Sequence, residues 1–461
     1  MSEIVCISPI DGTVVARRPT ASAVEIDAAL TAAGKAQAEW SCVPVKERAA
    51  AMLRFLEAMR ALDEEIVPEL ARQMGRPVRY GGEFRSFEER VKYMVEIAET
   101  ALAPLTPEPK AGFTRYIRRD PLGVILTVAP WNYPFLTAVN TVVPGIIAGN
   151  AVILKAASQT ILTGERFQQA MDTAGVPKGL FANLALSHAD TARLLSGGHV
   201  DHVSFTGSVL GGRAVERAAA GTFTSIGLEL GGKDPAYVRA DVNIEHAIEN
   251  LVDGAFFNSG QSCCGVERIY VHESLYKQFV DGFAALTRQY VLDDPLQEAT
   301  TLGPMAATRF ADLVRKQTAE AISKGAQALI NAKAFKRDAA GTPWLAPQVL
   351  TGVDHSMSVM TEESFGPVVG IMKVKDDAEA VRLMNDSPYG LTASLWTTDS
   401  DAAARLGAEI ETGTVYMNRC DYLDPGLAWT GVKDTGRGAS LSRIGYEMLT
   451  RPKSFHLREV K

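Results

Sequence analysis

The chain has 461 residues, of which 46% are hydrophobic and 22% charged, and its net charge is −7. This length is too great for one ordinary hydrophobic core, so two or three folding units are expected. The acidic balance argues against nucleic acid or an anionic membrane as the main partner. No stretch has the pattern of a signal peptide or of a bilayer span. We therefore expect a cytoplasmic protein.

Cysteine and histidine are too scattered to predict a disulfide framework or a metal site. The five cysteines contain no CxxC pair, and reduced thiols are the simpler interpretation. Two of them, Cys263 and Cys264, are adjacent in "GQSCCGVER". His199 and His202 lie three positions apart, but they run into the strand-like "HVSF", which predicts surface residues at the start of a strand. Metalloprotease, zinc-ribbon and P-loop signatures are absent from the sequence.

The first hundred residues are expected to be mostly helical. Residues 45–74 repeat apolar side chains every three or four positions, which predicts helix that ends near Gly75, before Pro77. Residues 115–130 have the pattern of a strand, a turn and a second strand.

Short apolar strands then alternate with amphipathic helices such as 161–175. The first series of predicted strands is 151–155, 181–186, 202–207 and 223–230. The second series is 234–238, 268–272, 347–351, 368–374, 391–397 and 413–418. This alternation predicts an α/β protein with parallel sheets built from βαβ units. A last alternating strand over 454–460 has no evident partner within its own unit.

A glycine-rich turn follows the predicted strand 202–207. Gly207 ends the strand, and Gly211 and Gly212 open a helix, which would leave backbone N–H groups free for a phosphate. The pattern is not GxGxxG, and a plain structural turn is an equally good interpretation.

Five short motifs together resemble the aldehyde dehydrogenase superfamily, and within it the semialdehyde dehydrogenase branch. They are "PWNYP" (130–134), "FTGS" (205–208), "LELGGK" (228–233), "GQSC" (260–263) and "EESFGPV" (362–368). The resemblance covers essentially the whole chain. It implies a Rossmann-like cofactor domain (1–110 and 129–230), an α/β catalytic domain (231–440) and a small β extension (111–128 and 441–461). The extension would supply the partner of the C-terminal strand and join subunits into a homodimer or homotetramer.

The implied chemistry is oxidation of an aldehyde to its carboxylic acid. A thiolate adds to the carbonyl to give a thiohemiacetal, and the resemblance assigns this role to Cys263 rather than Cys264. It assigns the Asn132 amide, with a backbone N–H, to the oxyanion. It assigns Glu229 to the base that activates water against the resulting thioester.

The resemblance implies NAD or NADP as the cofactor. The cofactor-binding residues it assigns are Trp131, Lys155, Ser158, Gly207, Ser208, Gly212, Glu363 and Phe365. NAD-specific sites commonly place a carboxylate against the ribose 2′-hydroxyl. Ser158 stands where the family places that carboxylate, which predicts that NADP is accepted and can be preferred over NAD. Ser158 also suits the N-cap of the following helix.

An uncharged, largely apolar aldehyde of medium size is the expected substrate. The channel residues are Tyr133, Thr137, Asn140, Phe257, Ser262, Cys264, Leu423 and Trp429. Succinic semialdehyde dehydrogenases hold a distal carboxylate with arginines at the positions of Asn140 and Phe257. Without such partners a buried carboxylate is unfavourable. Arg419, at the expected channel mouth, could nevertheless bind an acid.

Besides the Ala156-Ala157-Ser158 stretch, where the family often has Pro-Ser-Glu, two further residues depart from the family pattern, and three other functions remain open. Ser440 stands near the position of a glutamate that many members carry, and Glu267 replaces a small or hydroxyl residue. The alternatives are a succinic-semialdehyde-type dehydrogenase, a CoA-acylating or acyl-phosphate-forming relative, and a non-catalytic dinucleotide-binding structural protein. The presence of Glu229 disfavours the acylating relatives, because they must avoid a water-activating base.

Overall fold

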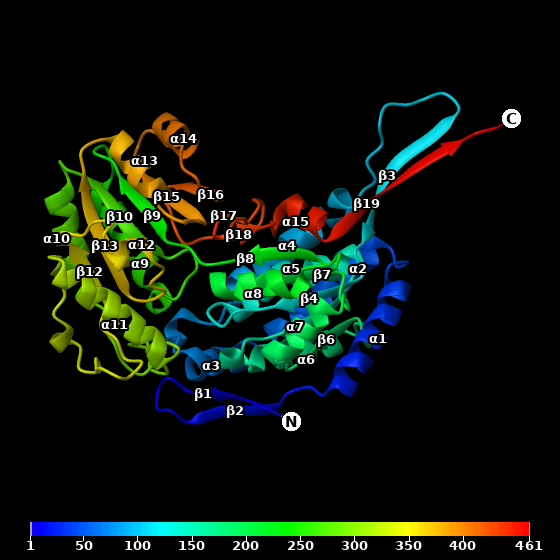
Figure 1. Cartoon of the computed structure of the whole chain (residues 1–461), viewed down its shortest axis with the longest axis horizontal. Helices are drawn as coiled ribbons and strands as arrows, with labels where there is room; N and C mark the ends of the chain where they lie inside the picture. Colours follow the sequence, from blue (N-terminus) through cyan, green and yellow to red (C-terminus); the bar gives the residue numbers. More distant parts are fainter. Residues whose placement is uncertain (1, 461) are drawn as a thin grey trace.

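Two largely parallel sheets organise residues 2–460, the part of the chain that this computed structural model describes (Figure 1). The first sheet has six strands in the order β18-β8-β7-β4-β5-β6. Its strands are β4 (Val124–Val128), β5 (Ala151–Lys155), β6 (Phe181–Asn183), β7 (His202–Thr206), β8 (Ser225–Glu229) and β18 (Gly436–Arg437). The central β4 and β5 are buried along their whole length, as continuous apolar runs in a parallel sheet should be.

Helices cover both faces of this sheet. They are α1 (Ala23–Trp40), α2 (Val45–Arg60), α3 (Asp63–Met74), α4 (Phe84–Ala101), α5 (Pro134–Ala148), α6 (Leu162–Thr173), α7 (His188–Ser196) and α8 (Val209–Ala219). Two 3-10 turns, η1 (Val78–Tyr80) and η2 (Ser158–Thr160), connect them. The predicted helix over 45–74 is two helices that break at Ala61 and Leu62. The apolar repeat continues across the break and conceals it, and the acidic residues after it suit a new helix N-terminus.

The second sheet has seven strands in the order β11-β12-β13-β10-β9-β15-β16. They are β9 (Asp234–Val238), β10 (Val266–His272), β11 (Gln327–Ala328), β12 (Gln348–Thr351), β13 (Val368–Val374), β15 (Thr392–Trp396) and β16 (Thr414–Met417). The surrounding helices are α9 (Ile244–Phe256), η3 (Phe257–Gly260), α10 (Tyr276–Thr287), α11 (Thr308–Ser323), η4 (Ala332–Ala334), α12 (Ser358–Thr361), α13 (Asp377–Asn385) and α14 (Ser400–Gly407). Both series of predicted strands are therefore present, and the α/β fold class is confirmed.

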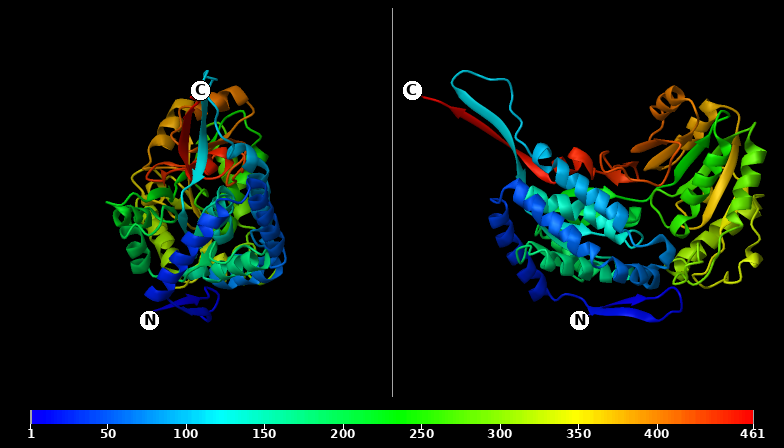
Figure 2. Two further views of the ribbon diagram at one scale, coloured as in Figure 1. Left: turned by 90° about the vertical axis from the view of Figure 1, so that its right-hand side faces the viewer. Right: turned by 180° about the vertical axis from the view of Figure 1, so that it is seen from behind.

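Three smaller β units complete the fold. They are the hairpin β1 (Glu3–Ile7) and β2 (Val14–Pro19), the pair β14 (Tyr389–Gly390) and β17 (Val432–Lys433), and the ribbon of β3 (Phe113–Pro121) and β19 (Thr450–Arg458). The ribbon pairs the C-terminal strand with β3 from Thr450↔Pro121 to Arg458↔Phe113. It stands away from the body of the molecule in Figure 1 and in the right-hand view of Figure 2. The C-terminal strand thus finds its partner in the segment that the resemblance implied.

The boundaries of the ribbon differ from those expected for the extension over 111–128 and 441–461. β4 lies at the centre of the first sheet, and helix α15 (Ser442–Met448) packs against α4 and α5. Likewise β18, expected in the catalytic domain, pairs with β8 of the first sheet. Only the strands β3 and β19 form the ribbon, because the adjoining apolar segments are buried on the sheet.

The predicted surface position of His202 is wrong. Its side chain is only 2% exposed, and the ring lies between the hydroxyls of Ser204 and Ser225 at 3.0 and 2.7 Å. Burial lowers the pKa of His202 to about 4, so the ring is neutral at physiological pH. Between residues 2 and 460, no helix has the length and hydropathy needed to cross a membrane.

Candidate active site

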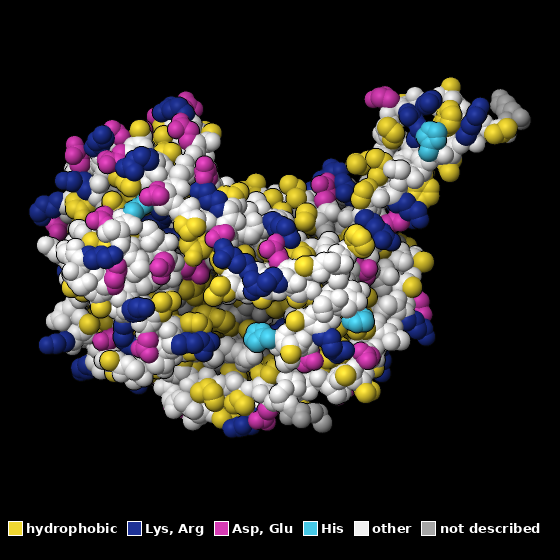
Figure 3. All heavy atoms as spheres, viewed as in Figure 1, with side chains coloured by type: hydrophobic (Ala, Val, Ile, Leu, Met, Phe, Trp, Pro, Cys, Tyr) yellow, Lys and Arg dark blue, Asp and Glu magenta, His cyan; other side chains and the backbone are white. Residues whose placement is uncertain are grey.

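Two cavities meet between the two sheets. The larger has a volume of about 1070 Å³ and lies between the carboxyl ends of the first sheet's strands and helix α11. The smaller has a volume of about 360 Å³ and lies on the side of α4 and α9. The hollow between the sheets is visible on the molecular surface (Figure 3). Thr206, Glu229, Leu230 and Cys263 line both cavities, so a thiol and a carboxyl group stand where the cavities join.

The loop that carries Cys263 is held in a strained backbone conformation. Asn258 and Ser259, within η3, have φ of 52° and 57°, a left-handed region that such residues adopt infrequently. The Asn258 amide donates to the Gln261 carbonyl at 3.3 Å. The Gln261 side chain donates to the Asn258 carbonyl at 3.1 Å and accepts from the Ala306 N–H at 2.8 Å. These buried contacts fix the position of Cys263.

The two adjacent cysteines lie in different environments. Cys264 is 3% exposed, and its thiol donates to the Asp421 carboxylate at 3.0 Å. The neighbouring Cys263 thiol and burial raise the pKa of Cys264, so Cys264 stays protonated. Cys263 is more exposed and lines both cavities. The geometry therefore supports Cys263, and not Cys264, as the nucleophile.

Asn132, in the loop between β4 and α5, lines the larger cavity together with Cys263. The side-chain amide of Asn132 donates to the backbone carbonyl of Gln261 at 3.1 Å. The backbone carbonyl of Asn132 accepts from the buried Arg76 guanidinium at 2.5 Å. In the described part of the chain the Cys263 N–H donates to no other backbone group. An amide and a free N–H near a thiol are the donors that an oxyanion requires.

Glu229 ends strand β8 and has two hydroxyl partners. Ser440 donates to Oε1 at 2.6 Å, and Thr206 donates to Oε2 at 3.1 Å. Burial raises the pKa of Glu229, and these two hydrogen bonds partly oppose that effect. A buried carboxyl group with a raised pKa is a suitable general base.

The larger cavity has the residues expected for a dinucleotide. Ser208 caps helix α8 and accepts from the Gly211 N–H at 3.2 Å, so the helix N-terminus faces the cavity with Gly207. Lys155 is buried, no carboxylate in residues 2–460 pairs with it, and burial lowers its pKa. A buried ammonium without a counter-charge is suited to oxygen atoms of a ligand. Ser158 is exposed within η2, and its N-cap interpretation is wrong because Ala157 precedes the turn.

One expected cofactor residue lies elsewhere. Gly212 is buried inside α8, where a Cβ atom would meet the Leu230 side chain. It therefore permits close packing between α8 and the segment after β8, and it does not line the cavity.

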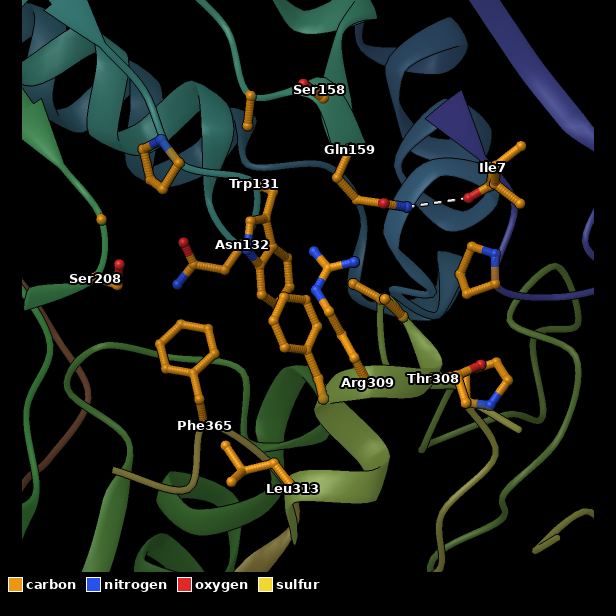
Figure 4. A pocket seen from close by; sticks show the side chains of 18 of the residues that line it. Ile7, Trp131, Asn132, Ser158, Gln159, Ser208, Thr308, Arg309, Leu313 and Phe365 are labelled. Atoms are coloured by element: carbon orange, nitrogen blue, oxygen red, sulfur yellow. Dashed lines mark hydrogen bonds between the residues drawn. The ribbon is translucent and has the colours of Figure 1, made fainter. Parts of the chain in front are cut away.

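Of the remaining cofactor residues, Trp131 and Phe365 form the cavity wall that Figure 4 shows, and Glu363 also lines the larger cavity. Trp131 and Phe365 pack edge to face with ring centroids 5.5 Å apart. The Glu363 carboxyl accepts from the Gly232 N–H at 3.0 Å, and burial raises its pKa to about 8.

Glu267 does not line the larger cavity, but it stabilises this wall. Its carboxylate accepts from the N–H groups of Ser364 and Phe365, both at 2.8 Å. Lys233 donates to the same carboxylate at 2.6 Å. Glu267 therefore holds the segment that presents Glu363 and Phe365 to the cavity, which explains this departure from the family pattern.

All eight expected substrate residues line the smaller cavity: Tyr133, Thr137, Asn140, Phe257, Ser262, Cys264, Leu423 and Trp429. The walls are nevertheless more polar than the expected apolar channel. Buried charges there have partners, since Arg76 pairs with Glu83 at 2.9 Å and Arg90 donates to Asn140 at 3.0 Å. Arg85 and Asp253 also line the cavity with exposed side chains, so the cavity carries charged groups of both signs.

Arg419 does not line the smaller cavity. Its guanidinium lies 3.3 Å from the centre of the Tyr422 ring. The acid-binding role considered for Arg419 therefore has no support in this geometry.

Two functional candidates could not be found from motifs. Arg309 of α11 lines the larger cavity, and its guanidinium lies over the Phe310 ring and extends toward Gln159 (Figure 4). Asp421 accepts hydrogen bonds from Ser262 and Cys264 at 2.7 and 3.0 Å, and burial raises its pKa. Neither residue belongs to one of the five motifs, so only the folded chain brings them to the site.

Comparison with known proteins agrees with this geometry. Residues 1–455 match the model of the aldehyde dehydrogenase family. The chain belongs to the aldehyde dehydrogenase family. The resemblance inferred from the five motifs is thereby confirmed.

Three aldehyde dehydrogenases illustrate the range of similar proteins. A succinate-semialdehyde dehydrogenase (NADP(+)) of Deinococcus radiodurans is 33% identical over 97% of this chain and 93% of its own length. A geranial dehydrogenase of Castellaniella defragrans is 31% identical over 95% of this chain and 92% of its own. The crystal structure of an NAD-dependent aldehyde dehydrogenase from Sinorhizobium meliloti superimposes with a TM-score of 0.95 at 31% identity, covering 100% of this chain and 92% of its own.

Proposed function

We propose that this protein oxidises an aldehyde to its carboxylic acid with NAD or NADP, through a covalent intermediate on Cys263. The observation that carries the proposal is the meeting of Cys263 and Glu229 at the junction of two cavities, one suited to a dinucleotide and one to a small substrate. A structural protein would require neither a reactive thiol nor a buried base at such a junction.

The first step is addition of the Cys263 thiolate to the aldehyde carbon. A C–S bond forms, and the carbonyl oxygen becomes an oxyanion that the Asn132 amide and the Cys263 N–H stabilise. Loss of one such donor reduces transition-state stabilisation by about 3–4 kcal/mol. A dinucleotide held in the larger cavity, which Trp131, Lys155 and Phe365 line, would supply the hydride acceptor for oxidation of the adduct to a thioester.

Glu229 serves the second half of the reaction. Its carboxylate takes a proton from water as the water oxygen attacks the thioester carbon, and the C–S bond then breaks to release Cys263 as a thiolate. A hydrolytic outcome follows from this base, which an acylating relative would have to avoid.

The cofactor site supports NADP as well as NAD. Ser158 brings no negative charge to the cavity, and Lys155 and Arg309 line it without carboxylate partners in the described chain. A carboxylate at position 158 would repel the 2′-phosphate of NADP. Removing one such like-charge contact changes the binding free energy by about 1–4 kcal/mol. The similar proteins from Deinococcus radiodurans and Sinorhizobium meliloti are named for NADP and NAD respectively.

Comparing kcat/KM for both cofactors in native protein and Ser158→Glu tests the proposal, and the substitution should depress NADP use far more than NAD use.

The substrate proposed is an uncharged, medium-size aldehyde. Asn140 and Phe257 offer no cation, and the buried arginines of the smaller cavity are already hydrogen-bonded. One observation favours a second candidate substrate, an acid semialdehyde. The exposed Arg85 side chain lines the cavity and could pair with the carboxylate of such a substrate. Comparing kcat/KM for hexanal and succinic semialdehyde separates them. A much higher value for succinic semialdehyde that falls in Arg85→Ala would favour the second candidate.

Cofactor reduction with a panel of aldehydes tests the proposed activity directly. Native protein should reduce NADP or NAD, Cys263→Ala should be inactive, and Cys264→Ala should retain turnover. Activity in Cys263→Ala with loss in Cys264→Ala would contradict the assignment.

A further inference from the structure

A third cavity lies behind Glu229. It has a volume of about 30 Å³, and its lining includes Ser204, Thr206, Glu229, Arg437 and Ser440. Glu229 and Thr206 border this cavity and also the two larger ones. The carboxyl group of Glu229 is therefore bounded on one side by the reaction site and on the other by a small space lined with hydroxyl groups.

Ser440 is held firmly at this position. Its N–H donates to the Trp429 carbonyl at 2.9 Å, and its carbonyl accepts from the Trp429 N–H at 2.8 Å. The next residue, Leu441, has φ of 62° and ψ of 178°, a backbone conformation that is essentially restricted to glycine. Leu441 is fully buried against Trp429 and Cys264, and this packing maintains the strained conformation. Strain of this kind concentrates at functional sites.

The Ser440 hydroxyl acts directly on the base. It donates to Oε1 of Glu229 at 2.6 Å, while Thr206 donates to Oε2 at 3.1 Å. An ionised carboxylate can only accept hydrogen bonds, so two hydroxyl donors favour the ionised form and fix the plane of the group. Burial acts in the opposite direction and raises the pKa of Glu229.

Other charged or titratable groups face Glu229 without a hydrogen bond to it. Arg90 of α4 contributes an attractive charge, but its guanidinium donates to the Leu136 carbonyl and to Asn140. Cys263 and Cys264 lie on the reaction side, and His202 and Arg437 border the small cavity. The two hydroxyls are thus the direct partners of the carboxyl group.

We propose that Ser440 is a positioning residue that keeps Glu229 ionised and correctly oriented for thioester hydrolysis. This inference rests on the proposed function. In that step, water transfers a proton to Glu229, its oxygen bonds to the thioester carbon, and the C–S bond breaks to release the Cys263 thiolate and the carboxylic acid. Without the Ser440 donor, Glu229 would be protonated over a wider pH range and less well oriented.

The test measures decay of the acyl group on Cys263. Enzyme, cofactor and hexanal are mixed, quenched at intervals and analysed by mass spectrometry of the Cys263 peptide, from pH 5 to 9. In Ser440→Ala the adduct should form at the native rate but decay more slowly at low pH. The acidic limb of the decay profile should move upward by about one pH unit, because loss of the donor raises the pKa of the base. Ser440→Thr should restore the native profile.

Ser204→Ala is the matched control, since Ser204 borders the same cavity but hydrogen-bonds to His202 instead of Glu229. Its decay profile should equal that of native protein. Should Ser440→Ala fail to fold, Ser440→Cys keeps the volume with a weaker donor and should show a smaller shift in the same direction. An unchanged acidic limb in the Ser440 variants, or an equal shift in Ser204→Ala, would overturn the proposal. Absence of any acyl adduct in native protein would instead contradict the proposed function.

Discussion

At the scale of single residues, the wall of the cofactor cavity depends on a buried ion pair. The side chains of Lys233 and Glu267 are 0% and 5% exposed, and Nζ and Oε2 are 2.6 Å apart. Lys233 also donates to the Ser364 hydroxyl at 2.9 Å. Since Glu267 accepts two backbone N–H groups from Ser364 and Phe365, it connects the ion pair to the cavity.

Glu267→Gln should destabilise the protein and weaken cofactor binding. It leaves the Lys233 charge buried without a counter-charge, and breaking a buried pair in this way costs about 3–5 kcal/mol. Urea denaturation should show the lower free energy of unfolding, and quenching of tryptophan fluorescence should show a larger Kd for the cofactor. The exposed pair of Lys277 and Asp281 provides the control. Asp281→Asn should leave both quantities unchanged, and similar losses in the two variants would contradict this account.

The motif residues that line the two cavities could be predicted from the sequence, whereas contacts between residues far apart in the chain could not. The order Gln261, Ser262, Cys263 selects the thiol that the structure leaves open to both cavities. One hydroxyl partner of Glu229, Ser440, lies 211 residues away along the chain. The polar wall of the substrate cavity was also missed, because Arg85 and Asp253 lie on helices α4 and α9 with no motif around them.

At the scale of elements, the end of helix α3 determines how closely the two halves of the molecule approach. Gly75 terminates α3 with φ of 86°, and a Cβ atom there would meet the backbone oxygen of Pro304. The helix end was predicted from the glycine and the following proline. The contact with Pro304 was not, because nothing local indicates which segment packs against the helix.

Gly75→Ala should lower stability by about 2–3 kcal/mol, since it combines a left-handed backbone with a steric clash. Gly175→Ala is a matched control, because Gly175 follows the end of helix α6 with φ of 69° and no atom lies within 4 Å of the added Cβ. Its free energy of unfolding should fall by only about 1–2 kcal/mol, the cost of a left-handed backbone for alanine. Urea denaturation of both variants measures the difference. Equal losses would show that the contact with Pro304 is unimportant.

At the scale of the whole molecule, the two ends of the chain lie in separate β units. The N-terminal strand β1 pairs with β2, and the C-terminal strand β19 pairs with β3. The ribbon of β3 and β19 extends from the body (Figure 2). Its exposed side chains include Leu457. We propose that it joins subunits into a homodimer or homotetramer. Light scattering should give a molar mass two or four times that of the chain, and removal of residues 451–461 should reduce it to that of one chain. An unchanged oligomer after truncation would contradict this role.

The sheet architecture was predictable because apolar strands and amphipathic helices alternate regularly. The domain boundaries were harder to predict, because the chain crosses between the two sheets. After the last strand of the second sheet, β18 pairs with β8 of the first sheet. That return brings Ser440 to Glu229, and so the path of the whole chain determines the environment of the base.

The most direct test of the account is rapid mixing of Glu229→Gln with cofactor and aldehyde. In the proposed mechanism, thiol addition and oxidation need Cys263 and Asn132, whereas thioester hydrolysis needs the Glu229 carboxylate. We predict a burst of reduced cofactor nearly equal to the concentration of sites, followed by a stall with the acyl group bound to Cys263. Disappearance of the burst would place Glu229 before oxidation, and continued native turnover would show that Glu229 is not the base.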